Sequence, residues 1–310
     1  MHHIVTITFS PSIDKSTTVS SLLPEKKLKC TSPNLNPGGG GINVARAIRK
    51  LGGEATAIFP SGGYTGKYFN QLMEDENVPS ITIKSSQETR ENIEVLDESS
   101  GNQYRLGFPG TELSEKEWKE CIAAVEDMED VEFIVASGSL PPGVPLDVYG
   151  RLSKIAKKKN AKFIVDTSGE ALRHALEEGV YLIKPNLGEL SALLGISRIE
   201  TDQVESLAKK IINKYHCEIV VVSYGKDGAM LVTKNETHRV KSPEVTQKST
   251  VGAGDSMVAG IVLSISKGMD LKQALQYGVA CGTAATMNQG TELCNKKDAD
   301  HLFKLITGSI

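Results

Sequence analysis

The sequence predicts an α/β protein whose central, mostly parallel sheet is flanked by helices on both faces. Short apolar runs rich in β-branched residues alternate with amphipathic stretches along most of the 310 residues, which is typical of parallel strands joined by crossover helices. Two stretches, about residues 15–36 and 87–110, break this alternation with polar segments that favour strands of a small second sheet. We therefore expect one domain over residues 1–310, with a discontinuous β-sheet lid.

The elements of the main sheet follow in order. The expected strands are short and mostly apolar: Ile4–Phe9, Ala55–Phe59, Phe133–Ala136, Lys162–Val165, Tyr181–Ile183 and Ile219–Ser223. The expected helices show helical periodicity: Ile42–Leu51, Gly66–Glu76, Ser114–Val125, Leu146–Lys158, Gln203–Lys214, Gly252–Lys267 and Leu271–Met287. Ser114 and Glu117 have the spacing of a capping box, and Gly52 follows the first helix as a C-terminal glycine would. Ligands of such sheets collect at the carboxyl ends of the strands.

Composition excludes several classes of protein. A net charge of −3 gives no electrostatic reason to expect nucleic acid or an anionic membrane as a partner. The five cysteines are odd in number and form no Cys-x-x-Cys pair, which argues against a disulfide framework and a zinc site and indicates a reducing compartment. No apolar run approaches the roughly 20 residues of a membrane span, and the first residues show no basic, cleavable leader. We expect a cytoplasmic protein.

The strongest chemical signal is the segment Ser249–Ser256 (STVGAGDS), which leads into an apolar helix pattern. Its small residues allow a tight turn, and the unpaired amides at the start of a helix suit a phosphoryl group that gains negative charge. Asp255 within this turn could take a proton from an attacking hydroxyl. The alternative is that Asp255 caps the helix while Gly252 and Gly254 serve the turn.

A second signal is the run of four glycines, Gly38–Gly41, directly before a helix pattern. Four glycines cost conformational entropy, so we expect another group to approach this backbone closely. Asn43 can offer a donor and an acceptor to a polyol. Neither the dinucleotide fingerprint nor a P-loop fits the spacing. The alternative is a merely flexible turn.

Further candidates lie where expected strands end and in the two irregular stretches. Asp14 follows the first strand and could accept from two sugar hydroxyls or cap a turn. The cations in or beside the irregular stretches are Lys27, Arg90 and Arg105. They suit a substrate that already carries a phosphate, although each alone could be solvated surface charge.

Three more loops follow expected strands. One contains Ser139. In the second, Asn186 and Glu189 are three residues apart and could hold Mg²⁺ through waters, or could form a helix cap, and Asp166 lies near the same edge. In the third, the segment Ser223–Gly228 could carry nucleotide phosphates on its amides or could be a plain hairpin turn.

The two glycine motifs, Gly38–Arg46 (GGGGINVAR) and Thr250–Ser256 (TVGAGDS), together with Asn186-x-x-Glu189, resemble the ribokinase-like (PfkB) sugar kinases along essentially the whole chain. Within that family, four further segments are similar to the minor bacterial-type 6-phosphofructokinases: Lys27–Thr31, Asp75–Pro79, Ser168–Leu172 and Asn288–Cys294. The resemblance implies a ribokinase-like fold and ATP-dependent phosphorylation of the 1-hydroxyl of fructose 6-phosphate, a step of glycolysis. Tagatose-6-phosphate kinases and 1-phosphofructokinases share the glycine motifs and are the alternatives. A sugar-phosphate sensor with the same fold is the non-enzyme alternative.

Site residues carried over from the resemblance fall into five groups. The catalytic group is Asp255 as the base, with Gly252, Ala253 and Gly254 as the anion hole. The group for the sugar phosphate is Asp14, Lys27, Gly39, Gly40, Asn43, Arg90, Arg105 and Ser139. The nucleotide group is Lys184, Asn186, Ser223, Gly225 and Gly228. The Mg²⁺ group is Glu189 and Asn186, to which Asp166 is added from its place after an expected strand. A K⁺ site would use Ser249, Val251, Ala285, Asn288 and Gly290.

Two consequences of the resemblance concern ions and assembly. Ser249 stands where ribokinase proper has an aspartate, which weakens the case for tight K⁺ binding. The lid sheet of the family commonly pairs across a homodimer, so Arg105 is expected to be able to reach the neighbouring subunit's site. The expected ligands are therefore Mg²⁺ with ATP, fructose 6-phosphate and a second copy of the chain.

Overall fold

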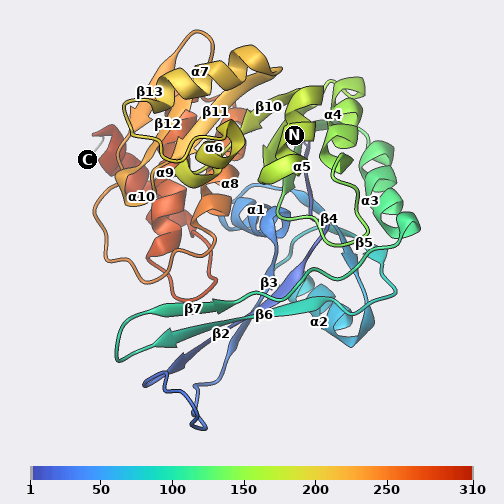
Figure 1. The fold of residues 1–310 in the computed structure, drawn as a ribbon, viewed down its shortest axis with the longest axis vertical. Helices are drawn as coiled ribbons and strands as arrows, with labels where there is room; N and C mark the ends of the chain where they lie inside the picture. Colours follow the sequence, from blue (N-terminus) through green and yellow to red (C-terminus); the bar gives the residue numbers. More distant parts are fainter. Residues whose placement is uncertain (1–2, 309–310) are drawn as a thin grey trace.

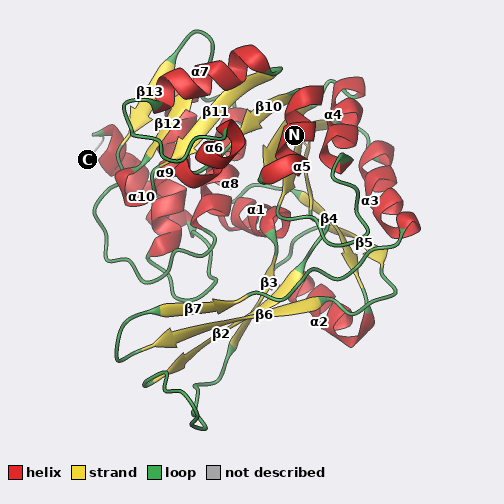
Figure 2. Ribbon diagram, in the orientation of Figure 1, coloured by secondary structure: helices red, strands yellow, loops and turns green. Residues whose placement is uncertain are grey.

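The computed structural model describes residues 3–308, and its larger sheet has nine strands (Figures 1 and 2). They are β1 (His3–Ile7), β4 (Thr56–Ser61), β5 (Ser80–Lys84), β8 (Val131–Ser137), β9 (Lys162–Asp166), β10 (Val180–Ile183), β11 (Cys217–Ser223), β12 (Ala229–Val232) and β13 (Thr237–Val240). The spatial order is β13-β12-β11-β10-β9-β8-β1-β4-β5, and the seven strands from β11 to β5 are parallel. The predicted α/β class is confirmed.

Helices cover both faces of this sheet, and a separate apolar core lies under each face. One core contains residues of α1 (Gly40–Lys50), α2 (Gly63–Asp75), α8 (Ala253–Ser266), α9 (Leu271–Thr286) and α10 (Lys296–Thr307). The other contains residues of α3 (Glu115–Asp127), α4 (Val148–Lys158), α5 (Gly169–Glu178), α6 (Leu187–Leu194) and α7 (Val204–Lys214). Strands buried on both faces explain why their sequences are continuous apolar runs rather than alternating ones.

The sheet is extended on both sides of β1, and this leaves a crevice at the carboxyl edge next to β1. From β1 the sheet grows through β4 to β5 on one side and from β8 to β13 on the other. The loops that follow β1 and β8 therefore diverge, and the space between them is the usual ligand position in a sheet of this kind.

The second sheet has four strands in the order β3-β2-β6-β7, and it extends away from the large sheet at the bottom of Figure 1. Its strands are β2 (Ser12–Val19), β3 (Asn34–Gly38), β6 (Arg90–Asp97) and β7 (Gln103–Leu106). The expected strand content of residues 17–36 is only partly present, because residues 20–33 are almost entirely loop. This segment contains Pro24 and Pro33 and the cluster Lys26–Lys29, and proline cannot donate to a strand ladder.

None of the helices within residues 3–308 combines the length and the apolar character that a membrane crossing requires.

Candidate active site

The first turn of α8 carries the predicted base. Gly252 is the residue before the helix and has a left-handed backbone (φ 70°), so its amide and those of Ala253 and Gly254 belong to the first, intrahelically unpaired turn. The N-cap of α8 is Gly252, which has no side chain, and Asp255 lies in the first turn of the helix. The Oδ2 of Asp255 accepts from Asn43 Nδ2 at 2.9 Å. Asp255 and Asn43 are thus brought together from opposite ends of the chain, and the capping alternative for Asp255 is not what the structure shows.

The environment of Asp255 suits a proton acceptor at neutral pH. Burial, together with the nearby carboxylates of Asp166 and Asp14, raises the pKa of Asp255 to about 7, against the opposing effects of Asn43 and Lys184. A general base works best when its pKa lies close to the working pH, because it is then both deprotonated and basic.

Lys184 brings a positive charge to the same place. Its side chain is buried, and its Nζ lies 3.4 Å from Asp166 Oδ1. A Cβ placed on Gly254 would lie 3.3 Å from the same Nζ, so the ammonium borders the anion hole. Burial acts to lower the pKa of Lys184, but nearby carboxylates, chiefly that of Asp166, outweigh it and raise that pKa. The ammonium therefore stays charged beside a site for phosphoryl groups.

The glycine turn, Gly38–Gly41, is needed for close approach rather than flexibility. A Cβ on Gly38 would lie 2.0 Å from Asp14 Oδ2, and one on Gly40 would lie 2.2 Å from Ser137 Oγ. Gly39 has a φ of 114°, which side chains rarely adopt. The turn thus packs between the loops that follow β1 and β8, in the crevice where the sheet diverges.

Asp14 lies on β2, at the root of the small sheet. Its Oδ1 accepts from Ser12 Oγ at 2.7 Å and from Asn92 Nδ2 at 2.9 Å. Glu94, two residues further along β6, is buried, and this burial raises the pKa of Glu94 against the effect of Arg105. Asp14, Asn92 and Glu94 therefore give the small sheet an acidic, polar surface, which suits the binding of sugar hydroxyls.

The four residues predicted for the sugar's phosphate lie in different surroundings. Arg90 donates from Nη1 to Phe108 O and from Nη2 to Ser10 O, while its Nε is buried with no partner among the described residues. Arg105 donates from Nη2 to Thr250 Oγ1 of its own chain at 2.7 Å. Ser139 is exposed in the loop after β8. Lys27 is exposed in the loop of residues 20–33. This loop, between β2 and β3, lies at the end of the small sheet that is remote from the large sheet (Figure 1).

Within the single chain Arg105 borders the candidate site, and the expectation that it can reach the neighbouring subunit stays a prediction. Together with Gln103, whose Nε2 donates to Lys248 O at 3.0 Å, Arg105 joins β7 to the segment just before the anion hole. These two contacts between β7 and the loop before α8 hold Arg105 beside the candidate site of its own chain.

The nucleotide-side residues lie at the ends of β10 and β11. Asn186 and Glu189 form a complete capping box at the start of α6: Oδ1 of Asn186 accepts from Glu189 N, and Oε2 of Glu189 accepts from Asn186 N, both at 2.9 Å. The capping alternative is thus present. Asn186 also forms an isolated bridge with Ser223. No cluster of three or more His, Cys, Asp or Glu side chains within residues 3–308 could hold a metal, so a divalent ion there needs phosphate and water ligands.

The segment Ser223–Gly228 is a hairpin turn between β11 and β12, with the short helix η1 (Gly225–Asp227) at its tip. No atom lies within 4 Å of a Cβ placed on Gly225, so its backbone is open to a ligand. Gly228 has a different reason to be glycine, because a Cβ there would lie 1.9 Å from Val240 O. The packing of β13 explains Gly228 without any nucleotide.

The residues predicted for K⁺ come from two segments that the structure joins. The amides of Lys248 and Ser249 both donate to Thr286 O at the end of α9. Ser249 Oγ accepts from Val251 N, and Asn288 Nδ2 donates to Leu293 O. Gly290 has a φ of 58°, and a Cβ there would lie 2.4 Å from Ser16 Oγ. The segment before α8 and the end of α9 therefore lie side by side, and the K⁺ site itself stays a prediction.

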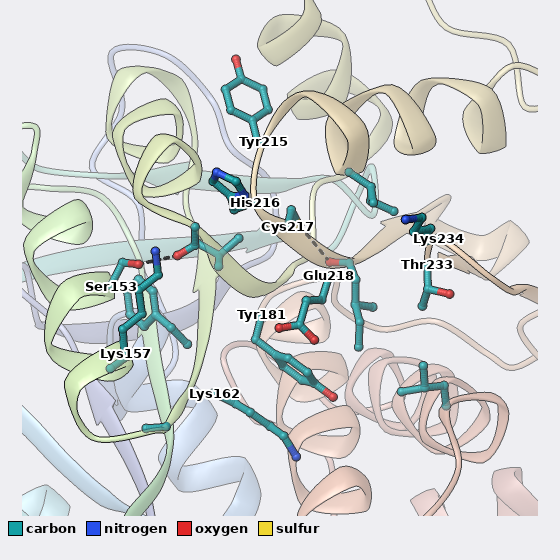
Figure 3. A pocket seen from close by; sticks show the side chains of 18 of the residues that line it. Ser153, Lys157, Lys162, Tyr181, Tyr215, His216, Cys217, Glu218, Thr233 and Lys234 are labelled. Carbon is teal, nitrogen blue, oxygen red and sulfur yellow. Dashed lines mark hydrogen bonds between the residues drawn. The ribbon is translucent and has the colours of Figure 1, made fainter.

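A groove of about 920 Å³ lies at the opposite, amino edge of β9, β10 and β11 (Figure 3). Its lining includes Lys162, whose Nζ is 5.3 Å from the centre of the Tyr181 ring, and Glu218. None of the predicted site residues lines this groove. Asp255, Asn43, Lys184 and Asp166 instead lie together near the carboxyl ends of the strands.

Residues 4–298 match the family model described as pfkB family carbohydrate kinase. The chain belongs to this family. The kinase is 45% identical over 308 residues to the ATP-dependent 6-phosphofructokinase isozyme 2 of Escherichia coli (strain K12), with 99% of this chain and 100% of that protein covered. It is 30% identical over 291 residues to the 1-phosphofructokinase of Bacillus subtilis (strain 168), with 93% and 95% covered.

Two solved structures of the Escherichia coli phosphofructokinase-2, one in complex with potassium and one with fructose-6-phosphate, match the kinase with TM-scores of 0.95 and 0.94. The identities are 45% and 43%, and each match covers 99% of this chain and 100% of the other. The resemblance drawn from the two glycine motifs is confirmed, as are the ribokinase-like fold and the expectation of a sugar kinase.

Sequence reasoning did not single out four polar residues that the structure places at the site: Arg46, Asn92, Glu94 and Gln103. Two of them, Asn92 and Glu94, alternate with apolar residues on β6, so their shared face was a signal that could have been used. Gln103 gave no such signal, because its partner Lys248 lies 145 positions away, and Arg46 gave none because its ion pair with Glu76 depends on the packing of α2.

Proposed function

We propose that this kinase transfers the γ-phosphoryl group of ATP to the 1-hydroxyl of fructose 6-phosphate, which yields fructose 1,6-bisphosphate and ADP. The observation that carries the proposal is the hydrogen bond between Asn43 and Asp255, which places a carboxylate with a pKa of about 7 between the glycine turn and the anion hole. The identity of 45% to a 6-phosphofructokinase, against 30% to a 1-phosphofructokinase, supports fructose 6-phosphate as the substrate. Tagatose 6-phosphate and fructose 1-phosphate are the alternatives to be tested.

In the proposed reaction, Asp255 takes the proton of the 1-hydroxyl as that oxygen bonds to the γ-phosphorus. The bond from the γ-phosphorus to the β–γ bridging oxygen breaks, and ADP leaves. The amides of Gly252–Gly254 and the Lys184 ammonium stabilise the charge on the phosphoryl oxygens. A positioned base of this kind contributes a rate factor of roughly 10²–10⁴.

Mg²⁺ enters with ATP as part of the substrate. Asp166, Asn186 and Glu189 face this region and would hold the hydrated ion mainly through waters, since Asn186 and Glu189 already cap α6. The nucleotide would lie over the open backbone at Gly225 and near Ser223. We further propose that K⁺ binds at Ser249, Val251, Ala285, Asn288 and Gly290, because the two segments that carry them are joined through Thr286 O and the Escherichia coli protein has a potassium complex.

The sugar would lie between the two sheets. Its hydroxyls would bind Asp14, Asn43 and the amides of Gly39 and Gly40, and its 6-phosphate would bind Arg90, Arg105 and Ser139. Arg90 keeps an unpartnered Nε toward this region, and Arg105 already borders the anion hole. Guanidinium groups suit a phosphate because they can donate two parallel hydrogen bonds.

We also propose a homodimer formed through the small sheet. Its edge strand β7 and the following turn expose Tyr104, Leu106 and Phe108, which are 40%, 52% and 49% exposed. An unpaired edge with exposed apolar side chains favours association with a second copy. Lys27, remote from the site of its own chain, is the cation that such a pairing would bring to the partner's site. The five free cysteines and the two phosphorylated substrates support a cytoplasmic kinase.

A coupled assay of ADP release with fructose 6-phosphate, tagatose 6-phosphate and fructose 1-phosphate tests the substrate. We expect kcat/KM to be at least about tenfold higher for fructose 6-phosphate, which corresponds to about 1.4 kcal/mol of discrimination. A higher value for either other sugar phosphate would replace it as the substrate.

Two further measurements test the remaining parts of the proposal. Absence of ADP release with every sugar phosphate, combined with sugar-phosphate binding by calorimetry, would support the sensor instead. A fully active monomer in sedimentation would remove the dimer while leaving the chemistry in place.

A further inference from the structure

Arg46 is a buried cation that the proposed chemistry does not use. It lies on α1, one turn after Asn43, and its side chain is only 1% exposed, which makes it the bulkiest of the fully buried side chains in the described residues. Its Nε and Nη2 donate to the carboxylate of Glu76, just after α2. The carboxylate partner keeps 23% of its side chain exposed. An ion pair with a buried arginine seldom stabilises a fold more than well-packed apolar side chains would, so stability alone gives little reason for an arginine here.

The third nitrogen of the guanidinium, Nη1, points toward the candidate active site. Nη1 of Arg46 donates to Pro37 O at 2.6 Å and to Asn43 Oδ1 at 3.3 Å. A guanidinium can only donate, so the Asn43 amide must turn its oxygen toward Arg46. The nitrogen of that amide then faces Asp255, which it contacts at 2.9 Å.

A third contact extends the network into the small sheet. Nη2 of Arg46 donates to Asn36 Oδ1 at 3.3 Å, and Asn36 Nδ2 donates to Thr291 Oγ1 at 3.0 Å. Asn36 lies on β3, directly before Pro37 and the glycine turn, whereas Thr291 lies in the loop after α9. One planar group therefore connects α1, α2 and β3.

We propose that Arg46 is a positioning residue, which holds the Asn43 amide and the glycine turn in the orientation that lets Asn43 donate to Asp255. The inference rests on the proposed phosphoryl transfer and adds a residue that touches neither substrate. Without Arg46, the Asn43 amide can turn over and place its oxygen against the Asp255 carboxylate. The two oxygens repel each other, and the base moves away from the 1-hydroxyl.

The substitution Arg46→Lys tests this role. Lysine keeps the charge near Glu76 but lacks the planar fork that serves Pro37, Asn36 and Asn43 together. We expect kcat to fall about 10- to 100-fold, the cost of a small misplacement of reacting groups, with KM for ATP within about twofold of wild type. The rate is measured with whichever sugar phosphate the wild type turns over fastest, so a wrong substrate assignment does not affect the result.

Glu76→Gln is the matched control. Glu76 contacts the Nε and Nη2 edge of the guanidinium, whereas Asn43 contacts Nη1. The variant therefore loses the ion pair and keeps both hydrogen bonds of Nη1. We expect a lower melting temperature with kcat within about twofold of wild type. Should Arg46→Lys not fold, the double variant Arg46→Gln with Glu76→Gln removes both charges together and leaves none unpaired.

A double-mutant cycle shows whether Arg46 acts through Asn43. In an Asn43→Ala background there is no amide left to orient, so Arg46→Lys should lower kcat by less than about threefold. An equal loss of kcat in both backgrounds would overturn the proposal, as would a wild-type kcat in either folded variant of Arg46. A wild type that turns over no sugar phosphate would instead contradict the proposed function itself.

Discussion

Asp255, Lys184 and Asn43 lie on elements that pack into the two apolar cores of the large sheet, whereas Arg90, Arg105 and Lys27 lie on the small sheet and its loops, which are largely exposed. The first group is partly or fully buried and already in mutual contact or electrostatic range. The second group is dispersed. Arg90 and Arg105 donate to groups of the protein, and Lys27 lies in a loop remote from the site.

This difference indicates a division of work between the two regions. Groups for phosphoryl transfer are preorganised, so no reorganisation is needed at the moment of reaction. Groups for the sugar's phosphate must exchange the partners they have in the free protein for the ligand. Substitutions at the large sheet should therefore act mainly on kcat, and those at the small sheet mainly on the affinity for the sugar phosphate.

The strongest test of the large-sheet region is Asp255→Asn. We expect kcat to fall by roughly 10²–10⁴ with a modest change in both KM values, because asparagine keeps the size of the side chain but cannot accept the proton. Steady-state kinetics on the folded variant measure this. The matched control is Asp270→Asn at the N-cap of α9, where asparagine caps as well as aspartate and kcat should not change. A near-normal kcat for Asp255→Asn would remove Asp255 from the role of base.

For the small-sheet region, Arg105→Ala is expected to weaken fructose 6-phosphate binding about 10- to 100-fold while ATP affinity stays nearly intact. The reason is the loss of one charge-assisted contact worth about 1.5–3 kcal/mol. Calorimetric titrations with each ligand measure the two affinities. Arg173→Ala, on the exposed surface of α5, is a control that removes an arginine far from the site.

Mixed dimers decide which subunit Arg105 serves. Because Arg105 donates to Thr250 of its own chain, mixing Arg105→Ala with Asp255→Asn subunits should restore no activity. Restored activity in demonstrated hybrids would place Arg105 in the partner's site.

The pH dependence of kcat/KM tests the electrostatics of the large-sheet region. Burial and the neighbouring carboxylates raise the pKa of Asp255 to about 7, and only the deprotonated carboxylate can accept a proton. The value of kcat/KM should therefore fall as the pH drops below about 7, by about tenfold per unit once Asp255 is mostly protonated. A profile that stays flat down to pH 5 would contradict the assignment of Asp255 as a base with a raised pKa.

The two regions also differ in how far sequence could predict them. The glycine turn and the anion hole are local patterns, since tight turns before helices demand small residues at fixed spacings. The orientation of Arg105 depends on a contact with a distant segment, because its partner Thr250 lies 145 positions away. The sequence pattern holds no information on such a contact.

Arg46 and the missed short elements show the same limit. Within an amphipathic helix, an arginine that pairs with a half-buried carboxylate of another segment has the same sequence pattern as one that faces water, until α2 is packed against α1. The sequence analysis does not predict helices α5 and α10 or strands β5 and β13, and it contains α6 and β12 only through the alternatives of a helix cap at Asn186 and a hairpin turn at Ser223–Gly228. Most of them are short, and their positions are determined by packing against the sheet rather than by their own periodicity.

The smallest expected effect is that of Glu189→Gln, which tests whether Glu189 only caps α6 or also helps to hold Mg²⁺. Glutamine at this position can still complete the capping box, so the melting temperature should hardly change. If Glu189 also helps to hold hydrated Mg²⁺, the neutral amide should raise the Mg²⁺ concentration for half-maximal activity about two- to tenfold, which equals the loss of a contact worth about 0.5–1.5 kcal/mol. Titration with Mg²⁺ at a fixed ATP concentration measures this.

Glu117→Gln is the matched control for Glu189→Gln. Glu117 occupies the same position in the capping box of α3, and its carboxylate also accepts from Ser86 N, so its substitution should cost more stability. It lies away from the candidate active site, and its Mg²⁺ requirement should stay at the wild-type value. If Glu117→Gln lowers the melting temperature without changing the Mg²⁺ requirement, and Glu189→Gln does the reverse, the effects on stability and on metal binding are separate. An unchanged Mg²⁺ requirement in Glu189→Gln would leave the capping box as the whole role of this carboxylate.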